Sequence, residues 1–151
     1  MKTSAPVTPR QILISLATAA LLCTMALTAL AAGYSYVEPA DFKKWLESGK
    51  TMKIVDIQTH DDFVSHHFTG SLETNAFPGK SSEDKKKLEK MLPRLTGGSE
   101  EIVVVCPRGG GGAKNTVDYL RENGIAEKRL IILKGGMQGW PYRELTVKGP
   151  K

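Results

Sequence analysis

Residues 101–124 have the sequence EIVVVCPRGGGGAKNTVDYLRENG. A run of β-branched apolar residues, Ile102 to Val105, ends at Cys106, and four glycines follow it. Inward-facing residues then recur at helical spacing: Ala113, Thr116, Val117 and Leu120. The pattern predicts a buried strand, a tight loop and a helix. Ligands of parallel α/β sheets bind at the carboxyl ends of the strands, and the sequence places a thiol at this point.

The glycine run, Gly109 to Gly112, favours an ordered anion-binding loop over a flexible linker. Each glycine in an ordered segment costs about 0.5–1 kcal/mol of extra backbone entropy, and linkers seldom join a core strand to the helix packed on it. An ordered loop of this kind turns N–H groups inward, beside the positive end of the next helix. Pro107 has no N–H, so the expected donors are the amides of Arg108, Gly109, Gly110, Gly111, Gly112 and Ala113.

We interpret Cys106 as a reactive nucleophile. The surrounding amides and the adjacent Arg108 create a positive field that favours the ionised form of a thiol. The alternative is a buried structural cysteine, the usual fate of an unpaired one.

The first 31 residues have the features of a secretory signal peptide. Lys2 and Arg10 precede an uncharged stretch, residues 11–32, and Ala29-Leu30-Ala31 matches a signal-peptidase site. The apolar stretch of about 20 residues is also long enough for an uncleaved N-terminal membrane anchor. We therefore expect residues 34–151 to be periplasmic or secreted, or membrane-anchored and facing the periplasm.

Composition limits the function classes that remain. Removing residues 1–31 leaves 19 basic against 16 acidic residues, so the formal net charge falls from +5 to +3. About 120 residues form one hydrophobic core. The sequence lacks a basic stripe interleaved with aromatic residues, so nothing in it indicates nucleic-acid binding.

After removal of residues 1–31, Cys106 is the only cysteine left. In an oxidising compartment, such an odd cysteine indicates a reactive group or an intermolecular link.

The rest of the chain alternates predicted strands with predicted helices. Further strands are expected at 34–37, 52–57, around Leu72 and at 130–133. Helices are expected from Pro39 to Gly49, after Thr59, and from a capping box at Ser81 and Asp84 to about Leu92. The segment from Pro141 onward is expected to be irregular. This alternation predicts a single α/β domain with a parallel sheet covered on both faces.

Three segments of the sequence resemble the signatures of the rhodanese (sulfurtransferase) family. The first is Ile54–Ile57 with Asp62-Phe63 and the turn His67–Ser71, and the second is Cys106 with Gly109 three residues later. The third is Leu133–Met137 through Trp140. The resemblance implies a five-stranded parallel sheet with helices on both faces, a domain over residues 34–145 and a tail over 146–151.

The resemblance also implies an activity. In that family a cysteine thiolate attacks a sulfane sulfur and becomes a persulfide, and a second nucleophile then collects the sulfur. We expect Cys106 to carry sulfur from thiosulfate or polysulfide to a thiophilic acceptor such as cyanide, a thiol or sulfide, without a cofactor. The amides of 109–113 would hold the anionic donor, helped by Arg108 and Lys114.

Three departures from the family pattern keep other activities open. Gln58 replaces a common arginine, Gly111 and Gly112 replace the usual polar residues, and the loop is one residue longer. A longer loop resembles that of phosphatases and arsenate reductases of the same fold, which need an arginine where this chain has Gly112. The alternatives are such an enzyme, or a non-turnover sulfur carrier that serves a periplasmic or membrane redox protein.

We assign the remaining chemistry-bearing residues to structural roles. His66 and His67 are neighbours that cannot easily converge on one ion, and His67 matches the turn histidine of the family, so we predict no metal site. Asp56 is expected to accept hydrogen bonds that hold the fold. Trp45 and Trp140 are expected in the core.

Overall fold

The computed structural model describes residues 33–149. The predicted signal peptide, residues 1–31, lies outside the described residues. Within the described part of the chain, no helix is long and apolar enough to cross a membrane.

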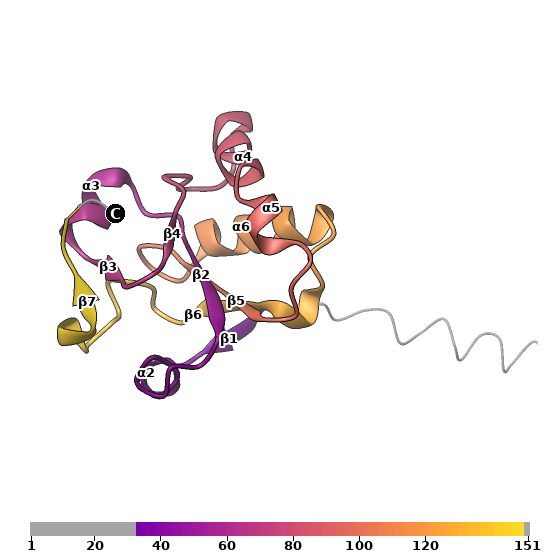
Figure 1. The fold of residues 1–151 in the computed structure, drawn as a ribbon. Helices are drawn as coiled ribbons and strands as arrows, with labels where there is room; N and C mark the ends of the chain where they lie inside the picture. The colour runs from indigo at the N-terminus through magenta and orange to yellow at the C-terminus, as the bar shows by residue number, and fades with distance from the viewer. Residues whose placement is uncertain (1–32, 150–151) are drawn as a thin grey trace, which may run out of the picture. The chain divides into compact units, whose positions relative to one another are not determined.

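A five-stranded, all-parallel sheet forms the centre of the domain (Figure 1). Its strands lie in the order β1-β6-β5-β2-β4. The strands are β1 (Ser35–Val37), β2 (Met52–Asp56), β4 (Leu72–Glu73), β5 (Glu101–Val105) and β6 (Leu130–Leu133). The predicted five-stranded parallel sheet is therefore confirmed, with β5, the strand that precedes Cys106, at its centre.

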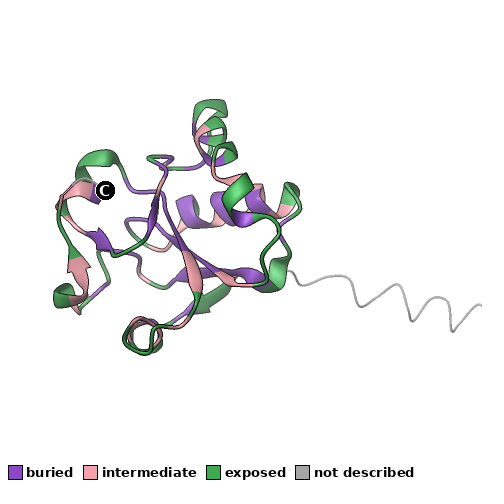
Figure 2. Ribbon diagram, viewed as in Figure 1, coloured by how far each residue is buried: buried purple, intermediate pink, exposed green. Residues whose placement is uncertain are grey.

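Alternate side chains of β5 supply the two halves of the core. Ile102 and Val104 pack in the cluster beneath three helices, α4 (Ser82–Glu89), α5 (Leu92–Leu95) and α6 (Gly111–Glu122). Val103 and Val105 pack in the opposite cluster, with Phe42 of α2 (Pro39–Glu47) and Trp140. Figure 2 shows the central strands and the inner face of α6 buried, while the outer faces of α2 and α4 are exposed. A parallel strand buried on both faces explains the unbroken apolar run.

The helix boundaries follow the predicted capping signals. Ser81 and Asp84 form a reciprocal capping box at α4, and the Thr59 side chain caps α3 (His60–Ser65). Beyond α6 the chain turns at Gly124, whose φ of +86° is costly for other residues. The helix α4 ends at Glu89 rather than near Leu92, and a separate short helix, α5, follows with Pro93 in its first turn, where a missing N–H is tolerated.

The expectation of an irregular segment from Pro141 is wrong. Residues 143–145 form the short 3₁₀ helix η2, and β7 (Thr146–Val147) pairs antiparallel with β3 (His67–Phe68). The N–H of Gly149 also donates to the carbonyl oxygen of Val64 at 2.9 Å. A two-residue strand is too short to carry an alternating pattern, so its pairing depends on a partner that is distant in sequence.

The carboxyl ends of β2 and β5 form a topological switch point. The chain leaves β2 toward β4 on one side, and leaves β5 through α6 toward β6 on the other. Adjacent parallel strands whose connections diverge in this way leave a crevice at their carboxyl ends, where ligands of α/β folds bind.

Candidate functional site

Cys106 lies at this switch point, directly after β5. It is a free cysteine, and the residue is 1 % exposed. The N–H of Gly109 donates a hydrogen bond to its Sγ at 3.1 Å. The loop therefore curls back over the sulfur, and the backbone amide of Gly109 faces it.

The backbone of residues 133–138 forms the floor of this loop. The N–H of Met137 donates to the carbonyl oxygen of Cys106 at 3.0 Å, and the N–H of Gln138 donates to that of Pro107 at 2.9 Å. A Cβ on Gly136, whose φ is +57°, would lie 2.1 Å from the same Cys106 oxygen. Only glycine allows two backbones to approach this closely, so the third sequence signature is a support for the cysteine loop.

Half of the glycine run belongs to the helix. Gly110 is the N-terminal capping position of α6, and Gly111 and Gly112 lie in its first turn. The N–H of Lys114 donates to the carbonyl oxygen of Gly110 and closes that turn. The expectation of a separate four-glycine loop is therefore wrong, because the loop is shorter. The amides of residues 111–113 belong to the N-terminus of α6. Such amides lack intrahelical acceptors and carry partial positive charge.

An open cavity of about 230 Å³ borders the thiol. Its lining combines the cysteine loop and the start of α6 with a segment that follows β4: Phe77, Pro78, Cys106, Arg108, Gly110, Gly111, Gly112 and Asn115. The thiol is almost fully covered, and this cavity gives a ligand a route to it.

The structure brings together most of the predicted site residues, but not all of them. Arg108 is exposed and lines the cavity. Ala113, in the first turn of α6, is fully buried in the core. The ammonium group of Lys114 lies 5.2 Å from the ring centroid of Tyr34, and Lys114 does not line the cavity.

Phe77, Pro78 and Asn115 were missed by the sequence analysis. Asn115 follows the glycine run and donates from Nδ2 to the carbonyl oxygen of Pro78 at 3.1 Å. Residues 77 and 78 lie in a segment without helical or strand periodicity. The dipeptide Phe77-Pro78 alone carries no signal that would place it against a cysteine loop.

The family model of the rhodanese-like domain matches residues 38–141, which include both strands at the switch point and the cysteine loop. The chain belongs to the rhodanese-like domain family. No curated protein sequence matches it.

Solved structures share the rhodanese-like fold at low sequence identity. A rhodanese-like domain protein from Staphylococcus aureus is 22% identical, with a TM-score of 0.59, over 77% of this chain and 99% of that chain. A thiosulfate sulfurtransferase from Pseudomonas aeruginosa is 21% identical, with a TM-score of 0.58, over 78% of this chain. The match spans only 20% of that sulfurtransferase. An As-Sb reductase from Leishmania major is 17% identical, with a TM-score of 0.59, over 79% of this chain and 88% of that chain.

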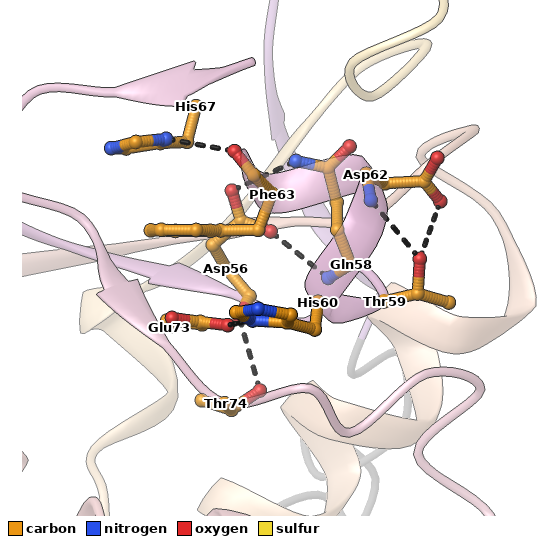
Figure 3. A network of polar contacts seen from close by, with 9 residues as sticks. All are labelled: Asp56, Gln58, Thr59, His60, Asp62, Phe63, His67, Glu73 and Thr74. Atoms are coloured by element: carbon orange, nitrogen blue, oxygen red, sulfur yellow. Dashed lines mark hydrogen bonds and ion pairs between the residues drawn. The ribbon is translucent and has the colours of Figure 1, made fainter. Parts of the chain in front are cut away.

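The first signature of this rhodanese-like domain forms a buried polar network (Figure 3). Asp56 is fully buried at the end of β2, and its carboxylate accepts from the backbone N–H of Gln58 at 2.9 Å and from Gln58 Nε2 at 3.1 Å. Gln58 Nε2 also donates to the carbonyl oxygen of His66. Burial raises the pKa of Asp56 from 3.8 to about 7, and the two hydrogen bonds from Gln58 offset only part of that effect. Asp56 holds the fold as predicted.

Two histidines of the domain make polar contacts, one buried and one exposed. His67 is buried, its Nδ1 hydrogen-bonds with the carbonyl oxygen of Phe63 at 2.8 Å, and its ring stacks on the Phe63 ring. His60 Nδ1 lies 2.7 Å from Glu73 Oε1, which raises the pKa of His60. Over residues 33–149, no cluster of three metal-ligating side chains is present.

Proposed function

We propose that this protein is an exported sulfurtransferase in which Cys106 carries sulfane sulfur as a persulfide. The observation that supports this most directly is the Gly109 N–H bonded to Sγ at the base of a cavity bordered by a helix N-terminus. The Cys106 thiolate attacks the sulfane sulfur of thiosulfate, the S–S bond of the donor breaks, and its electron pair leaves with sulfite. A thiophilic acceptor such as cyanide then removes the outer sulfur and restores the thiolate.

The backbone around Cys106 suits an anion that changes its position during transfer. The first amides of α6 carry the positive end of a helix of twelve residues, which favours negative charge close to it. Such amides are fixed before the reaction, so they stabilise the persulfide and the departing anion without reorganising. Arg108, at the exposed edge of the cavity, attracts the anionic donor.

The test compares the wild-type protein with Cys106→Ser after exposure to thiosulfate and to polysulfide. Intact-mass spectrometry should find the wild type heavier by one sulfur atom and the serine variant unchanged, because a hydroxyl does not form a stable adduct with sulfane sulfur. Wild-type protein should also turn over thiosulfate with cyanide. An adduct on the serine variant, or turnover by it, would refute the assignment of Cys106.

The same experiment separates a sulfurtransferase from a sulfur carrier. A carrier would take up the extra sulfur on Cys106 but show no steady turnover with small acceptors. It would release the sulfur only to a periplasmic or membrane redox protein.

Reduction or hydrolysis of an oxyanion is the second candidate, because the As-Sb reductase from Leishmania major shares the fold. The resemblance implies an arginine at position 112 for that chemistry. A Cβ on Gly112 would lie 2.9 Å from Cε2 of the Phe77 ring, so no longer side chain fits there unless Phe77 moves. Sulfur transfer is therefore favoured, and turnover of an aryl phosphate or arsenate would overturn that choice.

The proposed export depends on the N-terminal sequence alone. The mass spectrum of protein recovered from the periplasm should correspond to a chain beginning near Ala32. A full-length chain in the membrane fraction would indicate the anchor instead.

A further inference from the structure

The excess positive charge of the domain is concentrated in one segment. Residues 33–149 contain 18 basic and 16 acidic residues, which gives a formal net charge of +2. Residues 80–94, which include α4, contain six basic and three acidic residues, which gives a net charge of +3. The rest of the described chain therefore has a net charge of −1.

Two of the three carboxylates in this segment are already engaged within it. Asp84 is buried, and its Oδ2 accepts two backbone N–H groups at the start of α4. Glu83 Oε1 pairs with Lys87 Nζ at 3.5 Å. Glu89, which is exposed, is the carboxylate left to offset the remaining lysines. Four exposed lysines of the segment, here called the α4 lysines, form no ion pair with any residue of the described chain: Lys80, Lys85, Lys86 and Lys90.

Two of the α4 lysines lie beside the cavity of the thiol. Lys80 and Lys85 line a groove of about 140 Å³ between this segment and α6. Asn115 lines both this groove and the cavity, and Gly79 of the groove directly follows Pro78 of the cavity. A partner that rests on these lysines is therefore adjacent to the cavity that gives access to the thiol.

The groove also contains two carboxylates, Asp118 and Glu122. Asp118 accepts from the Tyr34 hydroxyl at 2.7 Å and from Arg121 Nη2 at 3.2 Å, so its charge is compensated within the domain. Glu122 is exposed at the end of α6. The α4 lysines and Arg108, which lines the cavity, outnumber the carboxylates that remain. The surface that leads from the cavity to α4 is therefore positive.

An acidic protein fits this surface better than a membrane does. Helices that bind lipid need an apolar face that enters the bilayer. The one apolar side chain within α4, Leu88, is fully buried. Opposite charge on a protein partner speeds association and selects against wrong partners, and it acts over about 8 Å at physiological ionic strength.

We propose that the α4 lysines dock an acidic protein that accepts sulfur from Cys106. The inference rests on the proposed persulfide chemistry of Cys106. A thiolate of the docked partner attacks the outer sulfur of the Cys106 persulfide and forms a new S–S bond. The bond between that sulfur and Cys106 Sγ breaks, and its electron pair returns to Sγ, which becomes the thiolate again. The partner leaves with the persulfide.

The test uses two synthetic peptides as acceptors, each with a single cysteine. Four glutamates flank the cysteine in one peptide, and four glutamines flank it in the other. The second-order rate constant for sulfur transfer from the Cys106 persulfide is measured at low salt, and the ratio of the acidic to the neutral peptide is taken for each protein. Comparing this ratio between proteins cancels the intrinsic reactivity of the two peptide thiols.

Wild type is compared with the double variant Lys80→Glu, Lys85→Glu and with a matched control, Lys128→Glu, Lys148→Glu. The control lysines are exposed and line neither the groove nor the cavity. Both variants change the net charge equally, and glutamate near the start of α4 suits the positive end of that helix. We expect the ratio to fall at least about fivefold in the first variant and to change less than about twofold in the control. Added salt should lower the ratio for wild type.

A ratio within about twofold of wild type in the Lys80→Glu, Lys85→Glu variant, or an equal fall in the control, would overturn the docking inference. Binding of wild type to phosphatidylglycerol vesicles with the same ratio in all proteins would assign the surface to lipid and overturn it as well. The glutamine pair Lys80→Gln, Lys85→Gln, which removes charge without reversing it, should lower the ratio less than the glutamate pair. In these outcomes Cys106 still takes up sulfur, so the proposed function stands. If Cys106 of the wild type takes up no sulfur, the proposed function itself fails, and the inference fails with it.

Discussion

The buried carboxyl group of Asp56 makes the stability of the domain depend on pH in an uncommon direction. Most carboxylates in folded proteins have lowered pKa values and stabilise the fold as pH rises. Burial raises the pKa of Asp56 from 3.8 to about 7. The folded state then holds a proton on Asp56 that the unfolded state has lost, so stability falls as pH rises between these two values.

The size of the effect follows from the two pKa values. The full difference of about three units corresponds to about 4 kcal/mol of unfolding free energy. Roughly one to two kcal/mol of this is already lost at pH 5, because the unfolded chain ionises near pH 3.8. The contribution of Asp56 should therefore fall by a further 2–3 kcal/mol, roughly, from pH 5 to pH 8.

Asp56→Asn isolates this contribution. The introduced amide would keep the acceptor for the Gln58 backbone N–H but place a second NH₂ group against Gln58 Nε2. This mismatch costs roughly 1–3 kcal/mol at every pH. The wild type should lose 2–3 kcal/mol, roughly, relative to the variant from pH 5 to pH 8, and the variant should be the more stable protein at pH 8.

Urea unfolding at half-unit pH steps, followed by tryptophan fluorescence, measures both free energies. Two histidines add their own pH dependence, because Glu73 raises the pKa of His60 and burial lowers the pKa of His66. Both are present in the two proteins, so their effects cancel in the difference. A difference that stays constant within about 0.5 kcal/mol from pH 5 to pH 8 would refute the assignment of a raised pKa to Asp56.

Three further substitutions test the loop, the cavity and a helix cap. Gly136→Ala should lower the free energy of urea unfolding by at least about 2 kcal/mol more than Gly49→Ala does. Both glycines have positive φ, but only a Cβ on Gly136 would meet backbone, at 2.1 Å. Equal losses in the two variants would contradict the close approach of residue 136 to the cysteine loop. Arg108→Ala should raise KM for an anionic donor about three- to tenfold with little change in kcat. Exposed Arg94→Ala serves as the matched control, and equal KM values in the two variants would contradict a role of Arg108 in donor binding. Ser81→Ala should lower the unfolding free energy by about 1 kcal/mol, because the capping box of α4 is lost, and unchanged urea unfolding would contradict that role.

Much of the fold was predictable from the sequence because its determinants are local. The apolar run before Cys106 gave the central strand, and its burial on both faces explains the absence of alternation. The capping box at Ser81 and the side-chain cap at Thr59 were correctly predicted, because a cap satisfies amides within its own turn. The position of Cys106 at a strand end followed from the same local pattern.

The tertiary structure alone decided how distant segments complete the site. The close approach of Gly136 to the Cys106 carbonyl, the place of Phe77 in the lining of the cavity and the β3–β7 pairing each join residues that are far apart in the chain. The orientation of Lys114 toward Tyr34 likewise depends on where β1 lies relative to α6. Local propensities specify the elements and their ends. Which backbone or side chain then faces the thiol depends on packing between elements, and no short stretch of sequence contains that information.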